Sequence, residues 1–151
     1  MRERSEMNSD RNNEQDESII KFFEENNIKY EKNYLFVMGF IKVEPMDYFI
    51  RAITFRFMPL HYIVLFEKDE IKFYGFKAFK FHPNPELIIK KSEIAEIKLT
   101  NNNFLGKLKI FTKSSEEKIK TYDFKVIVGN RKWTKENLEY LRNSEWSSKM
   151  I

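Results

Sequence analysis

The side chains best suited to acid–base chemistry or metal binding are two histidines. His61 begins an apolar run, and His82 precedes Pro83 in a loop. Imidazole is a versatile catalytic group and metal ligand. However, no second histidine lies at the H-x-x-x-H or H-x-x-E-H spacing that is typical of zinc sites. Structural or solvated roles are therefore predicted for both histidines.

Other catalytic arrangements are also missing from the sequence. The chain has no cysteine, so it offers no thiol nucleophile, no disulfide and no cysteine-ligated metal. Its 4 glycines are isolated from one another, so no glycine-rich loop can hold a phosphate. No serine stands in a G-x-S-x-G setting. The sequence predicts a protein that is not an enzyme and has no cofactor or metal.

Two groups of residues have the chemistry of binding. The first interleaves lysines with aromatic residues: Lys72, Tyr74, Lys77, Lys80, Phe81, Lys90 and Lys91. A cationic surface with exposed rings can hold nucleic acid or anionic lipid. The alternative is that these lysines lie on ordinary solvated strand faces and limit edge pairing.

The second group lies in residues 46–57, which are rich in Phe and Met and include Phe49, Arg51 and Arg56. A helix would place most of the apolar residues on one face, whereas Arg51 interrupts the alternation of a strand. The pattern favours a helix but leaves both structures open. An exposed helix here could lie in a membrane interface or a partner's groove, and a buried one would cover the sheet.

Composition predicts one domain. The chain has 151 residues, with Phe 15 and Tyr 7 against Gly 4 and Pro 4. Residues 1–33 hold 6 Lys/Arg and 9 Asp/Glu (−3), and residues 34–151 hold 21 and 14 (+7), which together give the net +4. The polar start has no signal-peptide pattern, and no apolar run approaches the roughly 18 residues that span a bilayer. A cytoplasmic protein is expected.

Most of the chain has the pattern of β-strands. A hairpin is predicted from residues 61–67 and 71–77, joined by the turn at 68–70. Further strands are predicted at residues 34–43, 87–89, 94–99, 104–111 and 118–128. Within residues 104–111, the alternation turns Phe104, Leu108 and Ile110 inward and Lys107 and Lys109 outward.

Helices are predicted at both ends. Residues 1–15 are expected to be disordered, followed by an N-terminal helix within residues 16–33, capped by Asp16 or Ser18. Its apolar side combines Ile19, Ile20, Phe22 and Phe23. Thr134 is predicted to cap a second helix that ends at Arg142, with Trp133 packed on Leu138. Residues 144–151 are expected to form a fraying tail from which Trp146 is able to dock.

The order of these elements resembles a pleckstrin-homology-like (PH-like) domain, and in particular its bacterial members. The stretches that carry the resemblance are residues 62–66, 71–74, 94–97 and 130–138, and the likeness covers residues 34–143. It implies an α+β fold in which a bent antiparallel sheet or barrel is closed by the C-terminal helix. It also implies a binding or assembly module.

One departure concerns lipid recognition. Eukaryotic lipid-reading members carry basic residues in the turn between their first two strands. If residues 61–67 and 71–77 are those strands, the turn at residues 67–70 holds three carboxylates and one ammonium, which argues against phosphoinositide binding.

The leading prediction is a non-enzymatic PH-like module that binds a protein partner or itself, through residues 46–57 or an exposed sheet edge. The alternative is peripheral binding to the anionic inner face of a membrane through Lys/Arg and aromatic residues. A further alternative is nucleic-acid binding.

Overall fold

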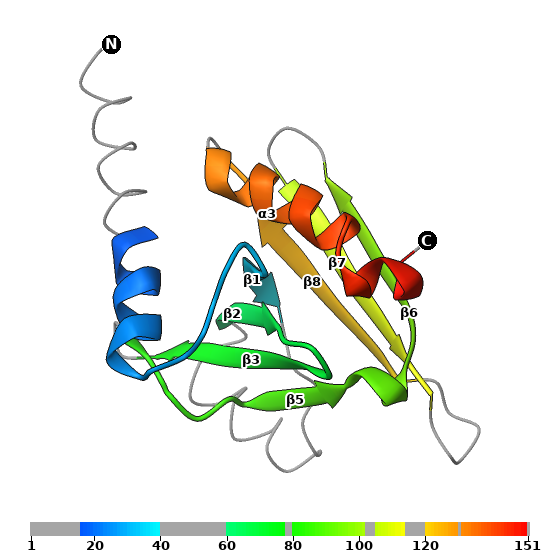
Figure 1. Cartoon of the computed structure of the whole chain (residues 1–151), viewed down its shortest axis with the longest axis horizontal. Helices are drawn as coiled ribbons and strands as arrows, with labels where there is room; N and C mark the ends of the chain where they lie inside the picture. The colour runs from blue at the N-terminus through cyan, green and yellow to red at the C-terminus, as the bar shows by residue number, and fades with distance from the viewer. Residues whose placement is uncertain are drawn as a thin grey trace.

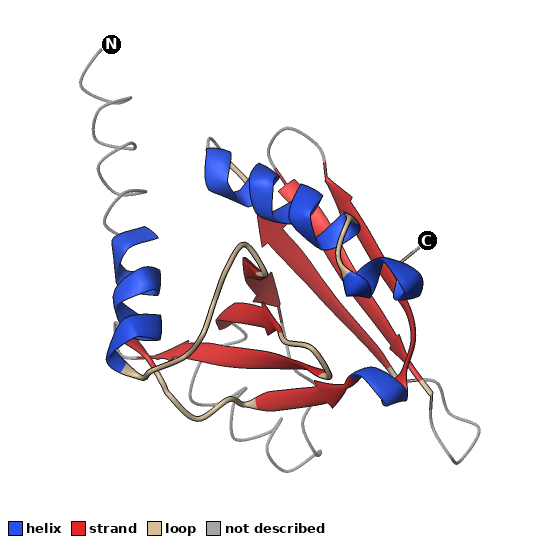
Figure 2. Cartoon of the chain, in the orientation of Figure 1, coloured by secondary structure: helices blue, strands red, loops and turns tan. Residues whose placement is uncertain are grey.

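Runs of β-branched and aromatic residues form the strands of one antiparallel sheet, and the fold is α+β (Figures 1 and 2). The computed structural model describes residues 16–39, 60–77, 80–101, 105–113, 120–129 and 131–150. The eight strands are β1 (Tyr34–Gly39), β2 (Leu60–Phe66), β3 (Glu70–Lys77), β4 (Lys80–Phe81), β5 (Leu87–Lys90), β6 (Ile94–Asn101), β7 (Leu105–Thr112) and β8 (Thr121–Ile127). The helical elements are residues 16–25, α3 (Lys132–Arg142) and the 3-10 helices η1 (Lys91–Glu93) and η2 (Glu145–Lys149).

The sheet order is β4-β3-β2-β1-β8-β7-β6, and β5 also pairs with β3. The first and last strands are therefore neighbours, joined by the pairs Val37–Val126, Met38–Lys125 and Gly39–Phe124. Gly39 permits this close approach, because a Cβ atom there would lie 2.6 Å from Phe124 Cδ1. This short ladder connects the two halves of the sheet.

The predicted hairpin is confirmed as β2 and β3, whose register runs from Tyr62–Gly75 to Phe66–Ile71. The predicted strands at 87–89, 94–99, 104–111 and 118–128 correspond to β5, β6, β7 and β8, and the strand predicted at 34–43 is observed as β1. The inward alternation is confirmed at Leu108 and Ile110. Phe104 lies outside the described residues.

The inner face of the sheet holds the larger apolar core. Side chains from β1, β2, β3, β6, β7 and β8 meet Leu138 and Leu141 of α3 and Trp146 of η2. In Figure 1, α3 lies in front of β7 and β8. The C-terminal helix therefore covers the inner side of the sheet.

The N-terminal helical residues 16–25 pack on the outer side. Ile19, Phe22 and Phe23 are buried in a second cluster with Tyr34, Phe36, Ile63, Leu65, Tyr74 and Phe81. The Phe22 ring lies 5.3 Å from Tyr74 and 5.5 Å from Phe81, centroid to centroid. The predicted apolar side of this helix is confirmed, and the helix is anchored on the outer face of β1–β3.

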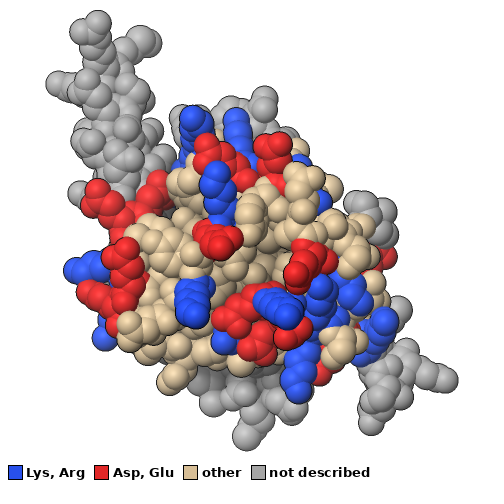
Figure 3. Space-filling model, in the orientation of Figure 1, with Lys and Arg blue, Asp and Glu red and all other residues tan. Residues whose placement is uncertain are grey.

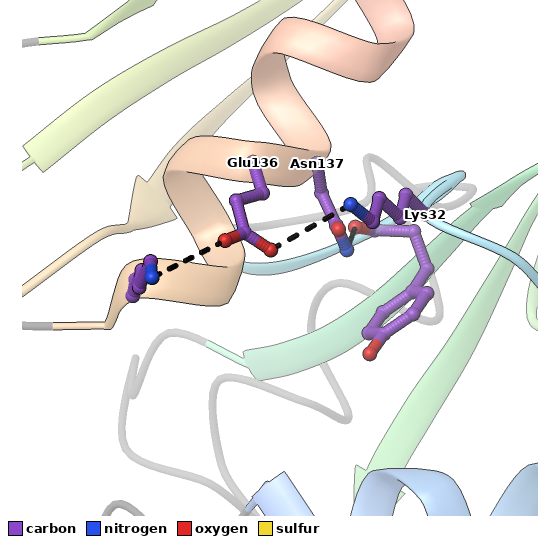
Figure 4. Close-up of polar contacts among 5 residues, drawn as sticks. Lys32, Glu136 and Asn137 are labelled. Carbon is purple, nitrogen blue, oxygen red and sulfur yellow. Dashed lines mark hydrogen bonds and ion pairs between the residues drawn. The ribbon is translucent and has the colours of Figure 1, made fainter.

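Three hydrogen bonds attach the C-terminal elements to separate parts of the sheet. Asn137 Nδ2 donates to the Tyr34 carbonyl oxygen at 2.9 Å (Figure 4). Trp146 Nε1 donates to the Glu67 carbonyl oxygen at 2.8 Å, and Arg142 donates to that of Leu99 at 3.1 Å. Together they hold α3 and η2 against β1, the β2–β3 turn and β6.

The free edge of β6 is covered by the end of the chain. Met150 forms a parallel bridge with Ile97, and Lys149 Nζ donates to the Ile94 carbonyl oxygen at 3.0 Å. The sheet is unclosed, since β6 does not pair with β4 or β5 in the described part of the chain. The described strands therefore do not form a closed barrel, which was one of the two predicted arrangements.

Four predictions about the chain ends need correction. Helix α3 begins at Lys132, with Arg131 at the N-cap, so Thr134 lies inside the first turn and does not cap it. Trp133 stacks on Tyr34 at 5.2 Å, because the earlier helix start turns it toward β1 instead of Leu138. Residues 144–150 do not fray: Trp146 docks with 3% of its surface exposed. Asp16 and Ser18 are already helical, so neither occupies the N-cap position.

The remaining predictions lie outside the described residues. They are the disorder of residues 1–15 and the helix or strand at 46–57.

We expect His61 to make stability depend on pH. Its ring stacks on Phe36 at 5.5 Å, and burial lowers the pKa of His61 below its ordinary value of 6.5. The folded chain then binds fewer protons than the unfolded chain. Stability is therefore full above about pH 6.5 and falls as the pH drops toward the folded pKa. His61→Phe should retain the stacking and flatten the urea-unfolding profile between pH 7 and 5; an unchanged slope would refute this role.

Trp146→Ala should destabilise the whole domain. Truncating a buried Trp costs about 3–5 kcal/mol, and the Glu67 carbonyl also loses its donor. Trp146→Phe is the matched control, because it keeps most of the packing and loses mainly the hydrogen bond. Urea unfolding measures both. An Ala variant as stable as the Phe variant would mean that η2 contributes little to the core.

Candidate binding surface

The structure separates the residues of the predicted basic, aromatic surface. Lys72 Nζ lies 3.1 Å from Glu67 Oε1 and 3.4 Å from Glu70 Oε1. Burial alone would lower the pKa of Lys72, but these two carboxylates raise it above its ordinary value. Tyr74 is buried against Phe22. The positive charge of Lys72 is thus balanced by two carboxylates. The buried ring of Tyr74 is not accessible to a ligand.

The other predicted lysines are spread along β3, β4, β5 and η1. Lys77 pairs with Lys80 between β3 and β4, and Lys80 and Lys90 are exposed. Lys91 Nζ lies over the Trp146 ring, 5.0 Å from its centroid. Phe81 is buried. The prediction of lysines alternating with exposed rings is therefore wrong at Tyr74 and Phe81, while Phe49, Arg51 and Arg56 lie outside the described residues.

A denser basic surface lies on the outer side of β6, β7 and β8. We call Lys98, Lys107, Lys109, Lys125 and Phe111 the lysine face. Lys98 stands directly opposite Lys109, and Lys107 directly opposite Lys125. Lys107 and Lys109 are two residues apart along β7 and so share one side of it, with Cα atoms about 6.7 Å apart. These side chains alternate with the inward residues of β7 and β8 that pack toward α3, so they lie on the opposite side of the strands from that helix.

The positive charge of the lysine face has few acidic neighbours in the part of the chain that the structure describes. Among the described residues, none of its four lysines lies within ion-pair distance of a carboxylate. The nearby acidic residues are Asp123, opposite Lys109, and Glu96, opposite Phe111. Like charges placed directly opposite on a sheet are destabilising. Repulsion between these lysines therefore lowers the stability of the folded protein.

Phe111 gives the lysine face one aromatic ring. The ring is half-buried, and Lys98 Nζ and Lys109 Nζ lie 5.6 Å and 5.5 Å from its centroid. Cation–π attraction holds ammonium groups at such distances. Two of the four lysines are therefore positioned beside an accessible π-surface.

The same side of the sheet is hollowed. A hollow of about 820 Å³ is lined by Lys107, Lys109, Lys125, Phe111 and Asp123, together with Met38 and Gly39 at the end of β1. It forms where β1 meets β8, beyond the area that the N-terminal helix covers. The lysines therefore line a recess as well as a sheet surface.

The sequence shows part of this surface. The alternation in β7 predicts that Lys107 and Lys109 face outward, which the structure confirms. Lys98 and Lys125 belong to separate strands, and only the observed register places them beside β7. The signal in the sequence that could have indicated the lysine face is the presence of lysines at outward-facing positions of neighbouring amphipathic strands.

A second concave region lies between α3, η2 and the β2–β3 turn. It measures about 1010 Å³, and its charged lining consists of five glutamates and two lysines: Glu31, Glu67, Glu136, Glu139, Glu145, Lys32 and Lys68. Lys32 Nζ lies 3.8 Å from Glu136 (Figure 4), and Tyr140 donates a 2.7 Å hydrogen bond to Glu31. Acidic and basic side chains are interspersed over this side of the molecule (Figure 3).

The structure also changes the argument about lipid recognition. The strands at 61–67 and 71–77 are β2 and β3, so the turn between them does not join the first two strands of the sheet. That connection is formed by residues 40–59, which lie outside the described residues. The acidic turn at 67–70 therefore no longer argues against phosphoinositide binding.

The N-terminal helix is attached near the start of α3 by an ion pair. Arg131 Nε lies 3.3 Å from Asp16 Oδ1, and the guanidinium lies over the Phe36 ring. Burial raises the pKa of Asp16, while Trp133 and the charge of Arg131 oppose that shift. Burial also lowers the pKa of Arg131. This partly buried pair adds a polar contact to the apolar packing of the helix on the sheet.

His61 and His82 lie apart from the lysine face. His61 stacks on Phe36, and the His82 amide donates to the Gly75 carbonyl oxygen. Over the described ranges, no three His, Asp or Glu side chains form a cluster that could hold a metal ion. In the same ranges, no helix is long and apolar enough to cross a membrane. A cytoplasmic location stays a prediction.

Comparison of the chain with protein-family models, with curated proteins and with solved structures found no match in any of the three.

Reversing the charge of one residue of the lysine face should stabilise the protein. Lys107→Glu replaces the like-charge pair with Lys125 by an opposite-charge pair, which should raise the free energy of unfolding by a few tenths to about 1 kcal/mol. Lys29→Glu, at an exposed site away from the sheet, makes the same change in net charge. Urea unfolding at low salt measures both variants. Equal effects would show that net charge, not strand pairing, sets the change.

Proposed function

We propose that this chain is a PH-like binding module that acts without catalysis and holds an anionic partner on the lysine face. The sheet order supports the PH-like part of the proposal, since one bent antiparallel sheet carries a C-terminal helix against its inner side. Fold alone does not fix function. The partner is therefore argued from the surface chemistry.

The observation that carries the proposal is the contrast between two sets of lysines. Lys72 lies between two carboxylates, each within 3.4 Å. On the lysine face, by contrast, Lys98 lies opposite Lys109 and Lys107 lies opposite Lys125, which makes two like-charge pairs. An anionic partner would convert that repulsion into attraction, so these lysines contribute more to binding than to folding. Their compact ammonium groups suit phosphate or carboxylate as point charges.

A protein partner or self-association is the second candidate. Ile88 on the edge strand β5 is 47% exposed, which supports pairing or packing of another chain there. The opposite edge, β6, is already covered by Arg142, Lys149 and Met150. This candidate therefore depends on the β5 edge, or on residues 46–57, which lie outside the described residues.

The proposal predicts salt-sensitive binding of inorganic polyphosphate, a polyanion without bases or lipid chains. Each lysine near an anionic surface contributes about 1 kcal/mol, so Lys107→Glu/Lys125→Glu should weaken binding by about 25-fold or more. Isothermal titration at low and high salt measures the affinity. High salt should weaken binding, because exposed charges are screened.

The matched control is Lys29→Glu/Lys135→Glu, which changes the net charge equally at exposed sites off the lysine face. It should bind nearly as well as the unmodified chain. If both double variants lose affinity to the same extent, binding reflects net charge alone, and the lysine face is not the site.

A further inference from the structure

The hollow, which is lined by three of the four lysines of the lysine face and by Asp123, has a shape that restricts its partner. Lys107, Lys109 and Lys125 line a recess of about 820 Å³ whose rim includes Met38 and Gly39 of β1. A flat bilayer meets projecting side chains more easily than recessed ones. A narrow chain can enter the recess and bring its charges close to all three lysines.

The spacing of the lysines suits a partner that carries charge at intervals. Lys98 and Lys109 form one row across the strands, and Lys107 and Lys125 form the next row. Successive rows on one side of a strand are about 6.7 Å apart. Four ammonium groups therefore cover a small grid that a phosphodiester backbone can follow.

Phe111 adds an aromatic ring to a site that is otherwise ionic. Its half-buried ring lies at the end of the grid, beside Lys98 and Lys109. Proteins that bind single-stranded nucleic acid combine a positively charged groove with aromatic rings on which bases stack. Phosphates would draw the two ammonium groups toward the strand and free a face of the ring for a base.

Resting on the anionic-partner function above, we propose that the hollow, together with the adjoining Lys98 of β6, binds a single strand of nucleic acid. The phosphates contact Lys98, Lys107, Lys109 and Lys125, and one base stacks on Phe111. The lysines make point-charge contacts with the backbone, so recognition is largely independent of sequence.

The proposal can be tested by fluorescence anisotropy with a short labelled oligonucleotide of mixed sequence and the full chain. Four phosphate contacts on a single strand predict a slope of about −3 in a plot of log K against log salt. Lys107→Ala/Lys125→Ala should reduce that slope to about −1.5. The duplex of the same sequence should bind more weakly, because its bases are not available to Phe111.

Phe111 separates base stacking from simple charge attraction. Phe111→Leu should weaken oligonucleotide binding by about five- to a hundredfold and leave the salt slope unchanged. Phe111→Tyr should retain binding, which controls for lost packing. Inorganic polyphosphate should bind equally to all three forms, because it has no base to stack. Thermal unfolding of each variant confirms that it is folded.

The outcomes distinguish this inference from the function on which it rests. Equal affinity for polyphosphate and oligonucleotide, with no effect of Phe111→Leu on either, overturns the nucleic-acid assignment and leaves the anionic partner in place. Binding to phosphatidylserine vesicles without binding to the oligonucleotide assigns the face to a membrane surface. Failure to bind polyphosphate, oligonucleotide and vesicles overturns both proposals.

Discussion

The three residue pairs between β1 and β8 hold the two halves of the sheet together, and much of the structure depends on them. Because the first strand pairs with the last, the whole sheet shares one inner face, which α3 and η2 cover. Gly39, in the last pair of this ladder, is needed there because a side chain at that position would collide with Phe124. The same junction forms the hollow at the end of β1.

The outer face of the sheet is used in two different ways on either side of that junction. Over β1–β3 it is apolar and aromatic, and the N-terminal helix covers it with the help of the partly buried Asp16–Arg131 ion pair. Over β6–β8 it carries lysines that repel one another. One half therefore adds to the stability of the fold, while the other lowers it and offers a charged surface. Natural proteins often retain such a loss of stability where function requires it.

Local sequence patterns predicted most elements but not the surface that we propose as the binding site. The hairpin, the inward residues of β7 and the apolar side of the N-terminal helix follow from periodicity, because each depends on residues close in sequence. The lysine face depends on strand register across β6, β7 and β8, which period alone does not define. Tyr74 has the type and spacing of a binding residue, yet the helix that buries it comes about fifty positions earlier in the chain. The start of α3 was misplaced because Thr134 is a good cap in isolation, whereas Arg131 occupies that position in the fold.

The covering of the β6 edge has a practical consequence for anyone who shortens this chain. A domain boundary drawn from sequence at residue 143 would remove Trp146 from the core, together with Lys149 and Met150 from the edge. The exposed backbone of β6 would then offer a template for strands of other molecules. Oligomers or aggregates of such a truncated protein would reflect the missing residues and reveal nothing about how the intact chain associates.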